Sequence, residues 1–207
     1  MRSGLVRKYV DKYSLGVVET GNSLRQYESF FRNMGIGKTI EQLIAEKLGQ
    51  KPLVRVMDIG CGDGGFLLDI KGIFGERVHT IGIDLLAPEK EPDEAIVGDC
   101  LEVPFPKEAD FVFSFRSLHE IGEPEKIVGK VHAALAPGGK AFLSFRTMDL
   151  YVGGVGIAEL GEKEVKALQK MVRSRKLGGF SVQGFEVTVK DDKGKKHTAG
   201  VNVILEK

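Results

Sequence analysis

A glycine-rich segment, VMDIGCGDGG at residues 56–65, limits the folds open to this chain more than any other part of the sequence. Gly60, Gly62 and Gly65 match the pattern G-x-G-x-x-G and stand between an apolar run and a helix-like segment. Glycines in such a turn allow the backbone to approach a ligand at the start of a helix, where side chains would collide with it. The segment therefore predicts a ligand-binding turn in an α/β sheet. Dinucleotide oxidoreductases and S-adenosylmethionine (SAM) enzymes share this pattern, so it leaves the ligand open.

Short apolar runs alternate with helix-like segments from residue 53 onward, which predicts a Rossmann-like, mostly parallel sheet with right-handed crossovers. A hairpin expected at 181–207 would add an antiparallel strand. The stretches 85–94 and 100–108 are too short for a full crossover helix, so one face of the sheet is expected to be thinly covered. The expected strands are 53–59, 78–84, 95–99, 109–115 and 140–145, and the expected helices of this part are 66–74, 124–136 and 159–179.

The first 50 residues are predicted to form a helical cap, with helices within 22–35 and 38–49. Residues 51–207 are predicted to form the ligand-binding domain. The cap and this domain together are expected to form a single compact unit. The first helix could instead pack on the sheet without any role in ligand binding. We favour this packing role for Phe30 and Phe31. Side chains of the cap that could help to bury a cofactor and its acceptor are Tyr9, Tyr27, Phe30, Phe31 and Arg32.

Two acidic residues lie at the carboxyl ends of the expected strands beside the glycine-rich turn. Asp58 stands just before the glycines, at the strand end where open α/β sheets bind ligands. A carboxylate there would repel a pyrophosphate but suits the sulfonium and ammonium groups of SAM. Asp84 ends the second expected strand, about 20 residues after the last glycine, where an acid accepts hydrogen bonds from ribose hydroxyls. The alternatives are that Asp58 caps the following turn and that Asp84 is an ordinary strand-end acid.

A third acid, Asp99, ends the next expected strand. Its carboxylate could accept a hydrogen bond from the exocyclic amine of adenine, and the Cys100 backbone N–H could donate to the adenine ring. This pairing complements adenine rather than nicotinamide. Asp99 also precedes a loop, so a plain turn residue is the alternative.

The charge balance and the cysteines narrow the function classes. Lys plus Arg is 30 and Asp plus Glu is 29, a formal net charge of +1, so no long-range field would attract nucleic acid. Cys61 and Cys100 are neither closely paired nor near a histidine at zinc-ligand spacing, which predicts reduced thiols and no metal site. We expect no signal peptide, and no apolar run is long enough to span a bilayer. The composition therefore predicts a cytoplasmic protein without a membrane partner.

Five segments, in order, resemble the motifs of the class I SAM-dependent methyltransferases. VMDIGCGDGGFLLDI at 56–70 is similar to the first motif of that family, GIDLL at 82–86 to the second and VGDC at 97–100 to the third. DFVFSFRSLHEI at 110–121 is similar to the fourth, and LAPGGKAFLSF at 135–145 to the turn and strand that follow. The resemblance implies that the ligand-binding domain is a methyltransferase domain, with a seven-stranded sheet whose last strand is antiparallel.

The resemblance also implies which residues hold the cofactor, SAM. Asp84 would take the ribose hydroxyls, and Leu85 would pack on adenine. Asp99 and Cys100 would hold the adenine edge, and the backbone of the glycine-rich turn would line the methionine and ribose parts. The full set implied for the cofactor is Asp58, Gly60, Cys61, Gly62, Asp84, Leu85, Asp99, Cys100, Ser114 and Phe115, and Arg116 would face the acceptor beside them.

The activity that the resemblance implies is transfer of the methyl group of SAM to an acceptor. Such a transfer is an in-line displacement in which the protein supplies alignment and a dry cavity, and a base matters only if the acceptor must lose a proton. His119, after the fourth expected strand, is the candidate base, and packing in the loop is its alternative role. We expect a small-molecule acceptor, with nucleic acid and protein left open. The glycine-rich stretch 147–158 could form a lid over the acceptor.

Two other functions stay open from the sequence. An NAD-dependent oxidoreductase would fit the glycine pattern together with Asp84, but Asp58 and the pair of Asp99 and Cys100 disfavour it. A SAM-binding regulatory protein without catalysis would fit the same motifs, because methyl transfer demands no unmistakable catalytic residue.

Overall fold

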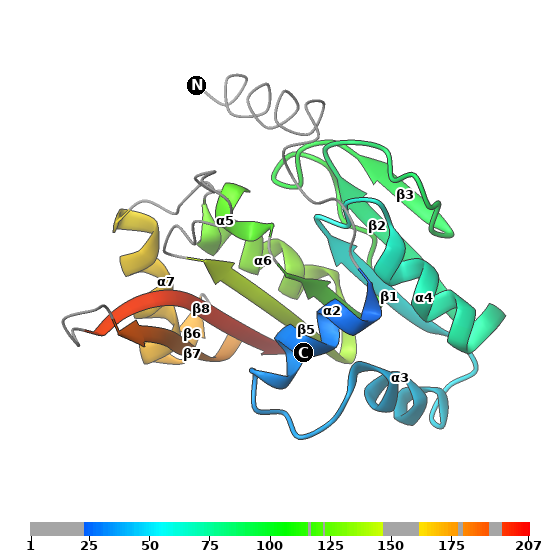
Figure 1. Ribbon diagram of the computed structural model, residues 1–207, viewed down its shortest axis with the longest axis horizontal. Coiled ribbons are helices and arrows are strands. Elements are labelled where there is room, and N and C mark those ends of the chain that lie inside the picture. The colour runs from blue at the N-terminus through cyan, green and yellow to red at the C-terminus, as the bar shows by residue number, and fades with distance from the viewer. Residues whose placement is uncertain (1–22, 116, 122, 147–161, 178–179, 191–195) are drawn as a thin grey trace. The chain divides into compact units, whose positions relative to one another are not determined.

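The computed structural model in Figure 1 describes residues 23–115, 117–121, 123–146, 162–177, 180–190 and 196–207. The chain divides into two compact units, Met1–Pro104 and Phe105–Lys207. Their elements give the α/β fold class that the sequence predicts, with a large, mostly parallel sheet and one antiparallel part. A boundary near residue 50 between a cap and a methyltransferase domain stays a prediction, and residues 1–22 lie outside the described part.

The first unit contains a parallel sheet and the helices that pack on it. In chain order its elements are α2 (Leu24–Arg32), α3 (Ile40–Leu48), β1 (Val54–Ile59), α4 (Gly65–Phe74), η1 (Gly75–Arg77), β2 (Val78–Asp84) and β3 (Glu94–Val97). The strands lie in the order β3-β2-β1, and β1 and β2 are buried along almost their whole length, as in sheets covered on both faces. The register pairs Asp58 with Gly82 and Asp84 with Val97, so the carboxyl ends of these strands reach one edge.

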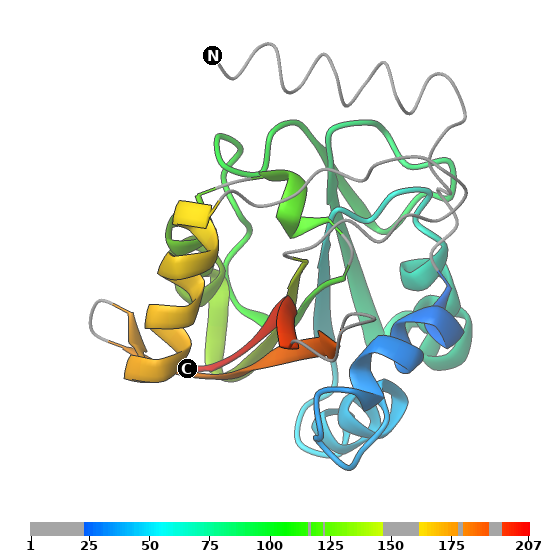
Figure 2. The same cartoon turned by 60° about the vertical axis from the view of Figure 1, so that its left-hand side comes forward.

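Helix α2 begins where the sequence predicts and lies alongside α4 (Figures 1 and 2). Ser23 forms a capping box at the start of α2. The Leu24 backbone N–H donates to Asp69 Oδ2 of α4 at 2.9 Å. The Tyr27 ring stacks on the Phe66 ring of α4, with centroids 4.1 Å apart. A backbone hydrogen bond and an aromatic pair therefore fix α2 on the helix that follows the glycine-rich turn.

The connection from β2 to β3 contains no helix within residues 85–93, all of which the structure describes, as the sequence predicts. Asp93 Oδ2 accepts hydrogen bonds from the Thr80 backbone N–H at 2.8 Å and from the Thr80 hydroxyl at 3.0 Å. Lys71 Nζ of α4 lies 2.9 Å from Asp93 Oδ1. Burial alone would raise the pKa of Asp93, but the hydrogen bonds from Thr80 and Lys71 outweigh burial and lower the pKa. One acid thus ties the connection to β2 and α4.

Replacing Asp93 by asparagine is expected to lower the free energy of unfolding by about 1 kcal/mol at pH 7, because hydrogen bonds to a partly exposed charge are weakened or lost. The folded-state pKa of Asp93 lies below its unfolded value of about 3.9. The contribution is therefore complete above the unfolded pKa and disappears as the pH falls through the folded pKa. Urea unfolding of the unchanged chain and of Asp93→Asn at pH 7 and in strong acid measures this difference.

The matched control is Glu76→Gln. Glu76 contacts the same Lys71 Nζ at 3.3 Å, but its side chain is 95% exposed. An exposed ion pair of this kind contributes little, so the control should unfold like the unchanged chain. Equal losses in the two variants, or a loss in Asp93→Asn that does not depend on pH, would contradict the role given to Asp93.

The second unit contains one parallel and several antiparallel strand pairs. In chain order its elements are β4 (Ala109–Ser114), α5 (Leu118–Ile121), α6 (Pro124–Ala134), β5 (Leu135–Arg146), α7 (Glu162–Ser174), β6 (Lys176–Leu177), β7 (Phe180–Lys190) and β8 (Lys196–Glu206). The strand order is β4-β5-β8-β7-β6, and β8 runs antiparallel to both β5 and β7, which confirms the predicted hairpin. Figure 2 shows α7 alongside β7 and β8. The short strand β6 is one more than the seven strands expected.

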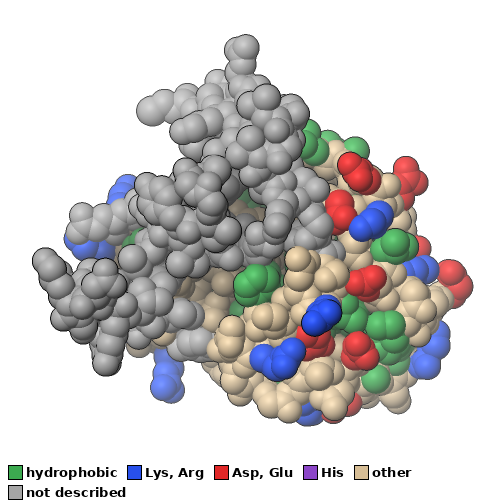
Figure 3. Space-filling view, in the orientation of Figure 1, with side chains coloured by type: hydrophobic (Ala, Val, Ile, Leu, Met, Phe, Trp, Pro, Cys, Tyr) green, Lys and Arg blue, Asp and Glu red, His purple; other side chains and the backbone are tan. Residues whose placement is uncertain are grey.

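The surface of the described residues fits the balanced composition. Figure 3 shows Lys and Arg side chains interspersed with Asp and Glu on the described part of the face that it presents. None of the helices in the described ranges is both long and apolar enough to cross a membrane.

Candidate functional site

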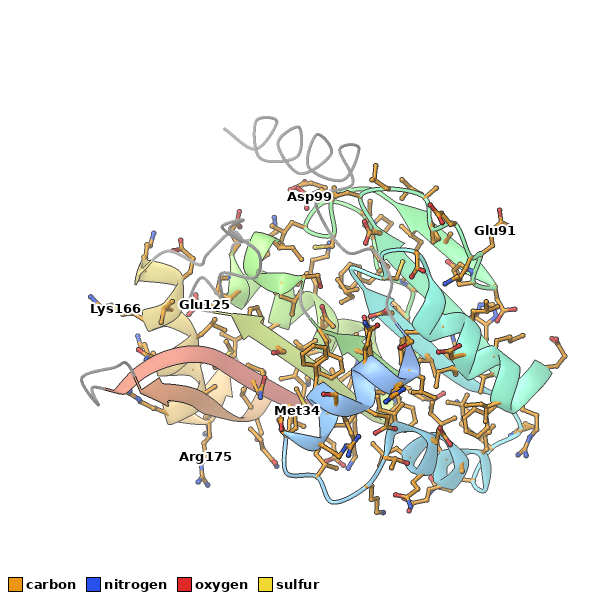
Figure 4. All side chains as sticks on the ribbon, viewed as in Figure 1. Met34, Glu91, Asp99, Glu125, Lys166 and Arg175 are labelled. Atoms are coloured by element: carbon orange, nitrogen blue, oxygen red, sulfur yellow. The ribbon has the colours of Figure 1, made fainter. Side chains whose placement is uncertain are left out.

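Three acidic residues lie at the carboxyl ends of neighbouring strands in the first unit, as the sequence predicts. The Gly98 backbone N–H donates to the Asp84 carbonyl at 2.8 Å, which places the start of the turn after β3 beside the end of β2. Figure 4 shows Asp99 beyond the carboxyl end of β3 and Glu91 near its amino end. Asp58 precedes the end of β1 by one residue. Carboxyl ends of parallel strands are where open α/β sheets bind ligands.

The glycine-rich turn after β1 is held against the end of β2 by its own backbone. The Gly60 and Cys61 N–H groups donate to the Ile83 carbonyl at 2.7 and 3.3 Å, and the Gly62 N–H donates to Asp84 Oδ2 at 2.9 Å. Gly60 and Gly62 have φ angles of 74° and 56°, which residues with a side chain rarely adopt. The turn therefore keeps a bare backbone next to the Asp84 carboxylate.

The Asp84 carboxylate is nearly buried, with 7% of the residue exposed. In addition to the Gly62 N–H, it accepts the Leu86 backbone N–H at Oδ1, at 3.3 Å. Burial raises the pKa of Asp84, and these backbone hydrogen bonds oppose the rise. A carboxylate has about four acceptor positions, so Asp84 keeps acceptor capacity for ligand hydroxyls beside its backbone partners.

Asp58 is fully buried, and its partner comes from the N-terminal helix α2. The Tyr27 hydroxyl lies 3.0 Å from Asp58 Oδ1 and 2.9 Å from Oδ2. Burial raises the pKa of Asp58 to about 8, the Tyr27 hydrogen bond opposes the rise, and the nearby Asp84 charge adds to it. No Lys or Arg pairs with Asp58 among the residues that the structure describes. A buried carboxylate without a cation is suited to a positively charged ligand group.

The sequence places Tyr27 on a buried helical face but does not predict its bond to Asp58. A tyrosine at an apolar helical position indicates only packing, and its hydroxyl partner, 31 positions away, leaves no local signal. Tyr27 and Phe31 are fully buried, so the packing favoured for Phe31 agrees with the structure, and Phe30 is half-buried. Tyr9 lies outside the described residues.

The segment after β2 covers the outer side of the glycine-rich turn. The Lys90 backbone N–H donates to the Asp63 carbonyl at 2.9 Å, and Lys90 Nζ contacts Asp63 Oδ2 at 2.7 Å. The Lys90 carbonyl approaches Gly64 so closely that no side chain fits there. Asp63 Oδ1 also accepts the Gly65 N–H at the start of α4, at 3.0 Å. The irregular segment after β2, for which no crossover helix was expected, thus holds the glycine-rich turn in place.

The residues predicted to contact adenine differ in burial and in hydrogen bonding. Asp99 Oδ1 accepts the Leu101 backbone N–H at 2.9 Å, which is the turn role that the sequence left open. That contact leaves further acceptor positions on the carboxylate. Cys100 is buried with 7% exposed, and Leu85 is half-buried. Contacts of Leu85, Asp99 and Cys100 with adenine stay predictions.

The remaining predicted site residues belong to the second unit. Ser114, at the end of β4, is fully buried, and its hydroxyl lies 2.9 Å from the Ser117 hydroxyl. Phe115 is buried, with its ring centroid 6.3 Å from that of Phe113. His119 falls within α5, and its side chain, like Arg116 and the stretch 147–158, lies outside what the structure describes. Their roles stay predictions. Among the described residues, no group of three or more His, Cys, Asp or Glu could hold a metal ion.

Comparison with known families decides among the sequence hypotheses. A family model described as a methyltransferase domain matches residues 29–176. The chain belongs to this methyltransferase domain family. The matched range begins within α2, after Tyr27, and includes the glycine-rich turn and the second unit as far as α7. The alternative of an NAD-dependent oxidoreductase is not favoured.

Curated relatives of this methyltransferase domain are named for different acceptors. Sterol 4-C-methyltransferase of Caenorhabditis elegans is 31% identical over 122 residues, which are 50% of this chain and 34% of the relative. Phosphoethanolamine N-methyltransferase 2 of the same organism is 34% identical over 107 residues, or 45% of this chain and 24% of the relative. A probable tRNA methyltransferase 9B of Homo sapiens is 30% identical over 109 residues, 48% of this chain and 23% of the relative. The chain thus spans about a third or less of these relatives.

Solved structures confirm the fold of the methyltransferase domain. The Burkholderia thailandensis 1,6-didemethyltoxoflavin-N1-methyltransferase, solved with 1,6-didemethyltoxoflavin and S-adenosylhomocysteine, matches 100% of this chain and 88% of its own, with a TM-score of 0.55 and 15% identity. The Haemonchus contortus phosphoethanolamine N-methyltransferase 2, solved with S-adenosyl-L-methionine, matches 82% of this chain and 53% of its own, with a TM-score of 0.52 and 18% identity.

Proposed function

We propose that this methyltransferase domain binds SAM at the carboxyl ends of β1, β2 and β3 and transfers its methyl group to a small organic acceptor. One observation carries the proposal: the buried carboxylates of Asp58 and Asp84 lie beside a bare backbone turn, and no described cation neutralises Asp58. SAM combines a cationic amino-acid end with a ribose diol. A buried acid and an acid with spare acceptor positions complement these two groups.

Each residue then has a part in holding the cofactor. Asp58 faces the cationic methionyl end, and Asp84 accepts hydrogen bonds from the ribose hydroxyls. The backbone of Gly60, Cys61 and Gly62 contacts the methionyl and ribose parts. By the order of the family motifs, Leu85, Asp99 and Cys100 contact adenine, and Ser114 and Phe115 contact the methionyl end.

The reaction requires alignment more than a catalytic group. SAM, when bound, supplies a methyl group on a sulfonium, which the acceptor attacks in line. The residues of this chain hold the cofactor in one orientation and exclude water, which together can account for a large share of the rate. If the acceptor must lose a proton, His119 is the proposed base.

A small molecule is the proposed acceptor class. Sterol 4-C-methyltransferase and phosphoethanolamine N-methyltransferase 2 are named for small-molecule acceptors. A formal net charge of +1 provides no field to attract a polyanion, which favours the small molecule over the tRNA suggested by the name of another relative. The proposal also places the chain in the cytoplasm, where the buried thiols of Cys61 and Cys100 would stay reduced.

Turnover of SAM labelled in its methyl group tests the proposal. The purified chain is incubated with labelled SAM in four separate reactions. These contain phosphoethanolamine, a sterol, a mixed extract of small metabolites, or tRNA. We expect label in a small-molecule fraction, together with one equivalent of S-adenosylhomocysteine for each methyl group transferred. Label in tRNA alone would overturn the acceptor class. SAM binding without any transfer would favour the non-catalytic regulatory protein instead.

A further inference from the structure

The N-terminal helix α2 reaches into the candidate cofactor site through one side chain. Tyr27 is fully buried, stacks on Phe66 at 4.1 Å and places its hydroxyl 2.9 and 3.0 Å from the two oxygens of Asp58. The helix itself is fixed to α4 by the Leu24 N–H bond to Asp69. The Tyr27 hydroxyl is therefore held in one place, and it is aimed at the acid rather than at solvent.

The surroundings of Asp58 make this hydroxyl important. Within the part of the chain that the structure describes, the titratable groups that face Asp58 are Tyr27 of α2, Cys61 of the glycine-rich turn and Asp84 of β2. None of the three is a cation. Burial raises the pKa of both the Cys61 thiol and the Tyr27 hydroxyl, so both stay neutral at pH 7, and Asp84 disfavours a second negative charge. The Tyr27 hydroxyl donates a hydrogen bond that favours the ionised form of Asp58.

We propose that Tyr27 is a positioning residue, which orients the Asp58 carboxylate and favours its ionised form for the cationic end of the cofactor, so that α2 is part of the cofactor site. This inference rests on the proposed function, because it needs a cationic ligand at Asp58. It assigns a role to the helical cap that neither the family motifs nor the glycine-rich turn indicate.

A consequence for binding distinguishes this role from packing. Asp58 has a pKa of about 8, so most of it is protonated at pH 7, and a cationic ligand must displace that proton. Loss of the Tyr27 hydroxyl raises the pKa of Asp58 further, so a larger fraction of Asp58 is protonated at neutral pH and must lose its proton when the ligand binds. Well above both pKa values, Asp58 is ionised with or without the hydroxyl. The effect on affinity should therefore be large at low pH and small at high pH.

The test is calorimetric titration of SAM into the unchanged chain and into Tyr27→Phe between pH 6.5 and 9.5. Phenylalanine keeps the ring that stacks on Phe66 and removes only the hydroxyl. We expect SAM to bind Tyr27→Phe about tenfold more weakly at the low end of this range, with the ratio of affinities approaching one at the high end. Taking the ratio at each pH cancels titration of the ligand itself, since both proteins receive the same SAM.

Two controls separate this effect from a general weakening of the site. 5′-Methylthioadenosine lacks the amino-acid end, so both proteins should bind it equally at every pH. Asp69→Asn weakens a different contact of α2 with α4 and does not touch Asp58, so any loss of SAM affinity in this variant should not depend on pH.

A second measurement needs no variant. SAM titrations into the unchanged chain at pH 7, in buffers of different ionisation enthalpy, should show release of about one proton per SAM bound. No proton release, or a Tyr27→Phe affinity ratio that stays constant with pH, would overturn the role of Tyr27 while leaving SAM binding in place. Absence of SAM binding by the unchanged chain would overturn the proposed function, and this inference with it.

Discussion

Replacing Asp84 by asparagine is expected to weaken SAM binding by about a hundredfold or more, because hydrogen bonds to a buried charge contribute roughly 1.5–3 kcal/mol each and Asp84 would form two with the ribose. Asparagine has the same shape, but it offers one acceptor oxygen and a competing donor. That donor would face the N–H of Gly62 or of Leu86, both of which now bond to the acid. Calorimetric titration of SAM into the folded variant measures the loss.

The control for Asp84→Asn is Glu91→Gln, which removes the same charge from the same unit. Glu91 is exposed and lies near the amino end of β3, away from the edge where Asp99 lies (Figure 4). SAM affinity should not change in this variant. An affinity in Asp84→Asn within about threefold of that of the unchanged chain would contradict the ribose role of Asp84.

Replacing Gly64 by alanine is expected to lower the free energy of unfolding by about 3 kcal/mol or more. Gly64 has a φ of 82°, and an added Cβ would collide with the Lys90 carbonyl and crowd the Pro88 side chain. Both partners belong to the segment that covers the turn, so the collision also displaces the contacts between Lys90 and Asp63. SAM affinity should fall together with stability, because the turn itself moves. Thermal and urea unfolding, followed by SAM titration, measure both.

Gly72→Ala is the matched control for this substitution. Gly72 lies within the same helix that follows the turn, and a Cβ there would meet no atom within 4 Å. Alanine in a helix interior is favoured over glycine by roughly 0.5–1 kcal/mol, so this variant should be slightly more stable than the unchanged chain. If the two variants were equally stable, the close approach of Lys90 to the turn would be contradicted.

Local patterns predicted much of the fold. The helix within 22–35 and the strand 78–84 follow from apolar periodicity and capping residues, and the structure has them as α2 and β2. The four-residue helix α5 and the two-residue strand β6 are too short to show a period. Strand β5 begins at Leu135, before the glycines that were expected to separate helix from strand, because Leu135 pairs with Ala109 across a shift in register.

The candidate site could be predicted where it depends on strand ends. Asp58 and Asp84 come together because β1 and β2 are parallel neighbours, and a glycine-rich turn followed by an acid about 20 residues later is a local pattern. The bonds of Tyr27 to Asp58 and of Lys90 to Asp63 join residues far apart in the chain. They depend on how α2 and the segment after β2 pack, which no local pattern encodes.

Titration of SAM into the unchanged chain, with NADH titrated in parallel, tests the central claim most directly. The account predicts one SAM bound per chain, no binding of NADH, and tighter binding of SAM than of 5′-methylthioadenosine, because the buried Asp58 carboxylate meets the cationic end that the smaller ligand lacks. Equal affinities for SAM and 5′-methylthioadenosine, or binding of NADH in place of SAM, would contradict it.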